Sequence, residues 1–257
     1  HNFQQKDSRI KVYTQKNNGT GVCRNKGIMY STGEYIMFVD SDDWLNLSAI
    51  EKVVDIFVST GVKVIQFNFL RYIEASGAYL QGKSIASLKT HHLINSNKNK
   101  FYNWKAVKPE CLWGMGLACR QRAYSKSFLE ENNIKFPPFT NAEEVLFKIA
   151  AVLKSDKFFI LDENLYYCRI RQGSSANSST NNNFCDFKVI KLVEEYLNKL
   201  NLIDELKNEF QNFKINILLN SGKKIPTENK SKFDKICLKI LSRKEYIMLN
   251  ERTFNYK

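Results

Sequence analysis

The chain has 257 residues, 43% of them apolar and 13% aromatic, which excludes an intrinsically disordered protein and allows a domain with its own core. No stretch approaches about 18 uninterrupted apolar residues, so the sequence predicts no membrane-spanning helix. The net charge of +13 leaves four interpretations open: a nucleic-acid partner, an anionic membrane surface, a phosphorylated substrate, or a lysine-rich surface that binds none of these.

The six cysteines form no CxxC pair and show no regular spacing. In a chain of this size, such cysteines are typical of reduced thiols in a cytosolic protein. The expected location is cytoplasmic, either free or attached peripherally to the inner face of the cytoplasmic membrane. The three histidines offer few further soft ligands, so no zinc site is expected.

The first third of the chain has the pattern of an α/β unit. The predicted elements, in chain order, are a short alternating strand at 10–16, a helix at 22–30, a buried strand at 34–40, a helix from the capping box Ser48–Glu51 to Gly61, and a strand at 62–73 followed by a hairpin turn at 76–77. Strand, helix and strand in this order are typical of an open α/β sheet, which binds ligands at the carboxyl ends of its strands.

The second half of the chain is less regular. Two prolines break it before a strong helix at 141–155, and a pair of strands is predicted at 158–171. A Ser/Asn-rich stretch is typical of a low-complexity linker, and the pattern after it is helical and basic. We therefore expect a domain at 1–173, a linker at 174–183 and a helical C-terminal region at 184–257.

An acidic cluster follows the predicted strand at 34–40, within the stretch YIMFVDSDDWLN. Asp40, Asp42 and Asp43 repel one another unless a positive group lies between them. Asp40 and Asp42, two positions apart at a strand end, can direct oxygens at one hard cation, Mg²⁺ or Mn²⁺, that also binds a diphosphate. Helix capping explains one Asp at such a place better than three.

A second pair of carboxylates, Glu143 and Glu144, opens the predicted helix at 141–155. The positive end of the helix dipole favours acidic side chains there, which is a purely structural explanation. A carboxylate beside a bound substrate could instead act as a general base. The residues alone do not decide between these two interpretations.

Four motifs, in this order, resemble the family 2 glycosyltransferases with the GT-A fold. NNGTGVCRNKGIMYSTGEYIMFVDSDDW is similar to that family's Asn-Gly, Ala-Arg-Asn-x-Gly, Gly-Glu-Tyr-Ile and DxDD segments, with Cys23 in place of the usual Ala. LWGMGLACRQRAYSKSFLEENNIKF, AEEVLF and LYYCRIRQGSS are similar to the segments that follow in the family. The resemblance as a whole covers roughly residues 6–175.

The resemblance implies a GT-A (Rossmann-like) mixed sheet flanked by helices. It also implies inverting transfer of a sugar from a nucleotide diphosphate donor to an acceptor hydroxyl. Asp42 matches the ligand of Mn²⁺ or Mg²⁺, Asp40 a position near the ribose and the metal, and Arg24 an arginine of the donor pocket. Glu144 falls at the family's catalytic Asp with Glu143 beside it, and the sequence does not decide which is the base. Single-displacement inversion needs one base and one Lewis acid, and no covalent nucleophile.

The chain departs from the family pattern at two places. In the family, a strand, a helix and a second strand that contacts the nucleotide base come before the first of these motifs. This sequence begins after the position of those elements. We therefore expect a GT-A domain that lacks its first strands. Arg171 stands where some relatives carry a His that completes metal binding.

The C-terminal region lies outside the resemblance. KSKFDKICLKILSRKEYIM mixes Lys and Arg with apolar residues in an amphipathic pattern. Either residues 223–257 bind an anionic membrane surface, or a helix packs on the core and leaves its lysines in solvent. Membrane docking would suit a lipid-linked glycan acceptor.

The sequence thus predicts an inverting glycosyltransferase that uses Mn²⁺ or Mg²⁺ and a donor such as a UDP-hexose or UDP-N-acetylhexosamine. Its acceptor would be a glycan or lipid-linked glycan in the synthesis of a surface polysaccharide or lipooligosaccharide. The alternative is a catalytically inactive basic module that binds membrane or nucleic acid. Nucleic acid is not expected as a partner, because the aromatic residues are not interleaved with Lys and Arg.

Overall fold

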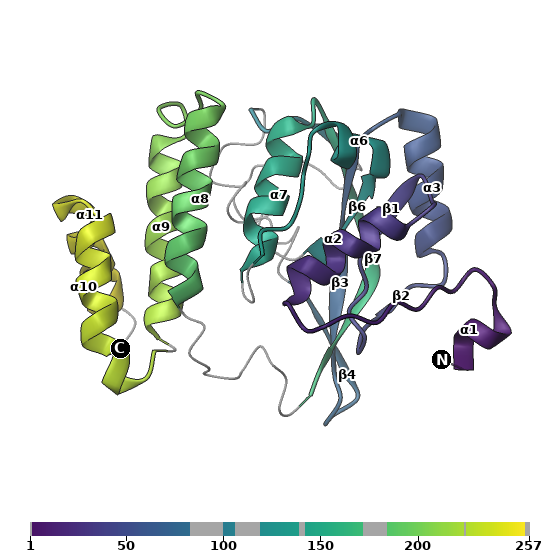
Figure 1. Cartoon of the computed structure of the whole chain (residues 1–257), viewed down its shortest axis with the longest axis horizontal. Coiled ribbons are helices and arrows are strands. Elements are labelled where there is room, and N and C mark those ends of the chain that lie inside the picture. The colour runs from purple at the N-terminus through teal and green to yellow at the C-terminus, as the bar shows by residue number, and fades with distance from the viewer. Residues whose placement is uncertain are drawn as a thin grey trace.

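The computed structural model describes residues 2–82, 100–105, 119–138, 142–171, 184–223 and 225–254. These residues form a mixed sheet with helices on both faces and a group of helices at the C-terminal end (Figure 1). The predicted α/β class with a helical C-terminal extension is confirmed. The predicted linker at 174–183 lies outside the described residues.

Seven strands form the sheet in the described part of the chain. Five lie in the order β1-β6-β3-β7-β2, while β4 pairs with β3 and β5 pairs with β7. β3 and β7 run parallel at the centre, and every other pair is antiparallel. The strands are β1 (Tyr35–Met37), β2 (Trp44–Leu45), β3 (Val64–Ile73), β4 (Ala78–Gln81), β5 (Lys100–Tyr102), β6 (Arg122–Ser125) and β7 (Phe158–Ile170).

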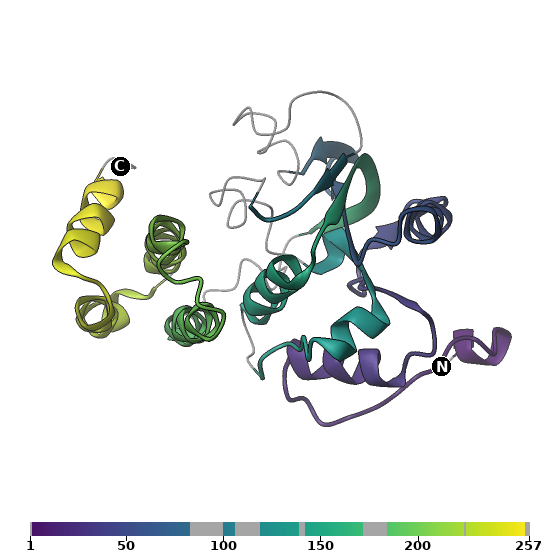
Figure 2. The ribbon, with the colours of Figure 1, turned by 90° about the horizontal axis from the view of Figure 1, so that it is seen from above.

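The helices form layers on the two sides of the sheet (Figure 2). α3 (Ala49–Thr60) packs on one face, and α2 (Thr20–Tyr30), α6 (Lys126–Glu131) and α7 (Glu143–Lys154) pack on the other. α7 is buried on nearly all sides because it lies between the sheet and α8 (Cys185–Lys199). A helix enclosed in this way holds the residues of its first turn in fixed places.

Most of the predicted elements appear where the sequence placed them. The helices predicted at 22–30 and 141–155 are α2 and α7, and the strands predicted at 34–40 and 62–73 contain β1 and β3. Gly61 ends α3 with φ of 67°, and Gly77, with φ of 68°, turns β3 into β4 as the hairpin prediction requires. Left-handed backbone of this kind is strained for residues other than glycine.

Three local predictions are wrong. Residues 10–16 form no strand, because no neighbouring strand in the described residues offers them backbone hydrogen bonds. The strand pair expected at 158–171 is the single strand β7. The polar residues that suggested a turn form a bulge instead, where Asn68 donates to Asp162 Oδ1 at 2.8 Å. Ser48 precedes α3 without capping it, and its hydroxyl donates to Asn46 Oδ1.

The C-terminal region is helical, as predicted. Its helices are α8, α9 (Lys207–Gly222), α10 (Lys230–Ile240) and α11 (Arg243–Phe254), with a short 3₁₀ turn at Thr227–Asn229. Earlier in the described part of the chain lie α1 (Asn2–Lys6) and a 3₁₀ turn at Cys119–Gln121. Much of the apolar side of α10 and α11 is buried, at Phe233, Cys237 and Leu249, while Leu238 and Ile247 stay exposed. None of the described helices has the length and apolar character needed to cross a membrane.

Candidate active site

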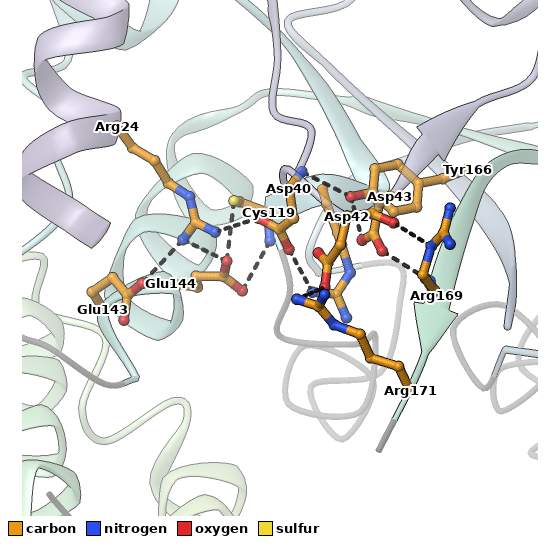
Figure 3. Close-up of polar contacts among 11 residues, drawn as sticks. Arg24, Asp40, Asp42, Asp43, Cys119, Glu143, Glu144, Tyr166, Arg169 and Arg171 are labelled. Carbon is orange, nitrogen blue, oxygen red and sulfur yellow. Dashed lines mark hydrogen bonds and ion pairs between the residues drawn. The ribbon is translucent and has the colours of Figure 1, made fainter. Parts of the chain in front are cut away.

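The acidic loop, residues 40–43, lies at the carboxyl end of β1 and connects it to β2 (Figure 3). The apolar residues 35–38 pack into the core, whereas Val39 and the carboxylates emerge where the strand ends. This is the edge at which open α/β sheets bind their ligands. The sheet therefore presents the acidic residues at a place suited to a substrate.

Arg24, on α2, connects the acidic loop to the first turn of α7. Its guanidinium donates to Asp40 Oδ1 at 3.1 Å and to Glu143 Oε1 at 3.0 Å, and it lies 2.6 Å from Glu144 Oε1. The arginine side chain is only 12% exposed. Burial alone would lower the pKa of Arg24, but the carboxylates of Glu144, Asp40 and Glu143 outweigh burial and raise it.

A second guanidinium completes the pairing of Asp40. Arg120 donates to Asp40 Oδ2 at 3.0 Å, so each carboxylate oxygen of Asp40 has its own arginine. Arg120 follows Cys119 in the 3₁₀ turn before β6. The positive groups that the acidic stretch requires are thus in part arginines from distant segments of the chain.

The two glutamates have different surroundings. Glu143 is buried, which raises the pKa of its carboxyl group, and Arg24 offsets part of this rise. Glu144 accepts the backbone N–H of Cys119 at Oε2 (3.2 Å) and its thiol at Oε1 (3.3 Å). Burial raises the pKa of the Cys119 thiol, so the sulfur keeps its proton and donates it.

Asp43 is held by the end of β7. Its carboxylate accepts the hydroxyl of Tyr166 at 2.6 Å and the backbone N–H of Arg169 at 2.9 Å. The same tyrosine hydroxyl accepts the backbone N–H of Asp40 at 3.1 Å. Arg169 also donates from Nε to the carbonyl of Asp42 at 3.1 Å. These contacts fix the loop backbone, and they give Asp43 a structural role.

Asp42 is the most available carboxylate of the loop. Among the interactions of the described residues, its carboxylate makes one ion pair, with Arg171 at 3.2 Å, and this arginine is 52% exposed. A pair this exposed contributes at most about 1 kcal/mol. Asp42 can therefore leave Arg171 for another cation at little cost.

Hydrogen bonds and close packing hold the loop before α7 against α2. Asn25 donates to the carbonyl of Phe136 at 2.8 Å and accepts its N–H at 2.9 Å. The Phe136 ring stacks on Phe147 of α7 at 3.9 Å between ring centroids. A Cβ added at Gly21 would lie 2.8 Å from the Pro137 carbonyl oxygen, so glycine permits this close approach.

The structure brings Arg24, Asp40, Glu143 and Glu144 together in one ion-paired cluster and places Asp42 in the same loop. Sequence reasoning did not find Arg120, Cys119 or Tyr166 as members of this site. All three lie inside motifs quoted for the resemblance, and this position in the motifs was the one indication that they belong to the site. The motifs did not predict their contacts with the acidic loop and with Glu144.

The side chains of the acidic loop offer three carboxylates and one hydroxyl, and oxygen atoms are the ligands that Mg²⁺ and Mn²⁺ prefer. Within the described residues, no group of three or more His, Cys, Asp or Glu side chains could hold a metal. Mg²⁺ bound to a nucleotide usually takes one or two protein carboxylates and completes its shell with phosphate oxygens and water. Asp42 fits that chemistry as it stands, whereas Asp40 could serve as a second ligand only after Arg24 or Arg120 leaves one of its oxygens.

Comparison with known proteins decides the family. A family model described as "Glycosyl transferase family 2" matches residues 1–130, just over half of the chain. This chain belongs to glycosyl transferase family 2. The resemblance carried by the motifs around the acidic loop is therefore confirmed at the level of the family.

Relatives of this family 2 chain include glycosyltransferase GlyA of Streptococcus pneumoniae, 27% identical over 178 residues, or 67% of this chain and 24% of that protein. Another is the poly(ribitol-phosphate) beta-N-acetylglucosaminyltransferase TarP of Staphylococcus aureus, 25% identical, with 66% of this chain and 47% of TarP covered. The chain thus spans less than half of either relative's length.

A solved structure supports the fold. S. aureus TarS 1-349 in complex with UDP-GlcNAc superposes on 85% of this chain and 64% of its own, with a TM-score of 0.57 and 20% sequence identity. The expected GT-A fold is confirmed by this likeness.

Proposed function

We propose that this chain carries the catalytic part of an inverting glycosyltransferase, which moves a sugar from a nucleotide diphosphate donor to a glycan hydroxyl. One observation carries the proposal: Arg24 joins Asp40 of the acidic loop to both glutamates of α7. One proposed donor-binding carboxylate, Asp40, and a candidate base are thereby held within one ion-paired cluster. Single displacement needs both groups at one site.

Glu144 is the proposed base. The motif resemblance matches it to the family's catalytic Asp, its side chain is more exposed than that of Glu143, and its carboxylate is held by Arg24 and Cys119. Glu144 would accept the proton of the acceptor hydroxyl as that oxygen bonds to the anomeric carbon and the nucleoside diphosphate departs. Glu143, buried against Arg24, would position the arginine.

Asp42 and Asp40 are the proposed metal ligands, and Arg24 with Asp40 the proposed donor contacts. A bound Mn²⁺ or Mg²⁺ would neutralise the charge of the departing diphosphate. Arg120 and Arg171 pair with these aspartates, and they lie where they could turn to the phosphate oxygens when a donor enters.

A UDP-hexose or UDP-N-acetylhexosamine is the proposed donor. The likeness to TarS solved with UDP-GlcNAc, and the relation to the N-acetylglucosaminyltransferase TarP, support this class. The proposed acceptor is a glycan or lipid-linked glycan of a surface polysaccharide or lipooligosaccharide, made by a cytoplasmic enzyme. The proposed catalytic domain ends near residue 173, after β7.

The test is UDP release by the full-length protein with Mn²⁺ and a panel of UDP-sugars. Because Glu144→Gln removes the proposed base, it should lower kcat by about 100-fold or more. Glu143→Gln should lower kcat by a smaller factor and should reduce the stability of the fold. Wild-type turnover in Glu144→Gln would refute the assignment of the base. No UDP release from any donor would refute the function itself.

Residues 223–257 are a second proposed contact, with an anionic membrane. Exposed Leu238 and Ile247 on basic helices support it, although the burial of Phe233 and Cys237 favours the packing interpretation. Flotation with vesicles that contain phosphatidylglycerol, an anionic lipid that attracts polybasic segments, tests it. Protein that stays in the soluble fraction would contradict membrane docking. Vesicle binding without nucleotide-sugar turnover would favour the inactive module.

A further inference from the structure

An uncharged aromatic hollow lies beside the acidic loop. Its volume is about 620 Å³, and it is lined by Trp44, Leu45, Asn46, Leu47, Leu70, Tyr79 and Tyr167. No charged side chain belongs to this lining, as far as the described residues show, although the protein carries a net charge of +13. The hollow therefore suits a neutral ligand and not a diphosphate or a nucleic acid.

The aromatic rings of the hollow are held in place by one another. Trp44 stacks on Tyr167 across the β2–β7 pair, with ring planes 6° apart, and the Arg169 guanidinium lies 5.4 Å from the Trp44 ring centroid. Tyr79 meets Tyr167 edge to face and also packs on Tyr72. Rings fixed in this way offer a preformed surface, which lowers the entropic cost of binding.

Polar groups accompany these rings. The Asn46 amide lies 3.5 Å from the Tyr167 hydroxyl, and Gln81 and Asn164 exchange side-chain hydrogen bonds nearby on β4 and β7. Apolar ring faces with neutral amides and hydroxyls at their rim match a sugar ring, which has apolar C–H faces and a rim of hydroxyls.

The hollow adjoins the acidic loop through Trp44. Trp44 directly follows Asp43, and Arg169 contacts both the Asp42 carbonyl and the Trp44 ring. A sugar bound in the hollow would therefore lie next to the loop that is proposed to hold the donor's diphosphate.

We infer that this aromatic hollow binds sugar units of a neutral glycan acceptor. Tyr79, 53% exposed on β4, offers its ring to the sugar, and the stacked rings of Trp44 and Tyr167 also line the hollow. The inference rests on the proposed function for its link to transfer, but the binding of glycan can be measured without a donor.

The experiment is saturation-transfer NMR of the full-length protein with chitotetraose, maltotetraose and cellotetraose as probes. Tyr79→Ala is compared with Leu80→Ala, which is equally exposed at 54% but alternates to the other face of β4. We expect the wild type to bind at least one probe, Tyr79→Ala to bind it about tenfold more weakly, and Leu80→Ala to bind it like the wild type.

Binding of none of the three probes by the wild type, or equal binding by wild type and Tyr79→Ala, would overturn the inference. A dimer that dissociates in Tyr79→Ala, detected by sedimentation, would assign the hollow to a second copy and also overturn it. UDP release by the wild type without acceptor tests the proposed function alone, and the NMR experiment tests glycan binding in the hollow alone. Tyr79-dependent binding without UDP release would refute the proposed function and leave the glycan site standing.

Discussion

Removing the guanidinium of Arg24 should destabilise the fold, because three carboxylates depend on it. Breaking a buried ion pair by removing one partner costs about 3–5 kcal/mol, whereas an exposed pair contributes about 1 kcal/mol or less. The contacts of Arg24 with Glu143 and Glu144 are largely buried, and that with Asp40 is partly exposed. We expect Arg24→Met to lose about 3 kcal/mol of unfolding free energy at pH 7.

The loss of unfolding free energy in Arg24→Met should also depend on pH. In the wild type, burial raises the pKa of Glu143, and Arg24 offsets part of that rise. Without Arg24, the pKa of Glu143 in the folded variant should therefore be higher than in the wild type. A carboxyl group whose folded-state pKa lies above its unfolded value stabilises the fold at low pH, and that stabilisation is lost as pH rises through the folded pKa. The deficit of Arg24→Met should therefore be larger at pH 8 than at pH 5.

Urea unfolding of wild type and Arg24→Met at these two pH values measures both effects. Arg171→Met is the matched control, since its pair with Asp42 is 52% exposed on the arginine side and should change stability by no more than about 1 kcal/mol. Equal stability of Arg24→Met and wild type, or a deficit that grows as pH falls, would refute the reasoning.

Two further pairs of variants test the geometry by urea unfolding. Gly21→Ala should cost about 1–3 kcal/mol, because its Cβ would lie 2.8 Å from the Pro137 carbonyl oxygen; Gly27→Ala, in the same helix with open space around it, should be stabilising. Equal effects would contradict this packing. Tyr166→Phe should cost about 1–3 kcal/mol by leaving two loop groups unpaired, and Tyr167→Phe should cost less. The reverse order would show that the hydroxyl does not hold the loop.

Local sequence patterns were enough to predict the elements that carry the site. The apolar run of β1, the periodicity of α3 and α7, and the acidic stretch are short-range signals. They correctly placed Asp40 after β1 and Glu144 in the first turn of α7. The order of the motifs then predicted the fold. Local pattern failed for the bulge in β7, where turn-forming residues stay in the strand because Asn68 of β3 pairs with them.

The partners of the acidic loop could not be predicted from local pattern. Arg120 meets Asp40 across 80 positions of sequence, and the hydroxyl of Tyr166 meets its backbone across 126. Such contacts follow from the pairing of β6 and β7 with the central strands, which only the folded sheet fixes. The sequence required a positive group at the loop, and folding supplied two arginines, Arg24 and Arg120.

Metal-dependent UDP-sugar turnover by the full-length protein tests the central claim most directly. Initial rates of UDP release are measured against Mn²⁺ concentration for wild type, Asp42→Ala and Asp55→Ala, the last removing an exposed acid of α3 away from the site. We predict release that requires Mn²⁺ or Mg²⁺, that falls by about 100-fold or more in Asp42→Ala, and that is unchanged in Asp55→Ala. Undiminished, metal-stimulated release in Asp42→Ala would contradict the account.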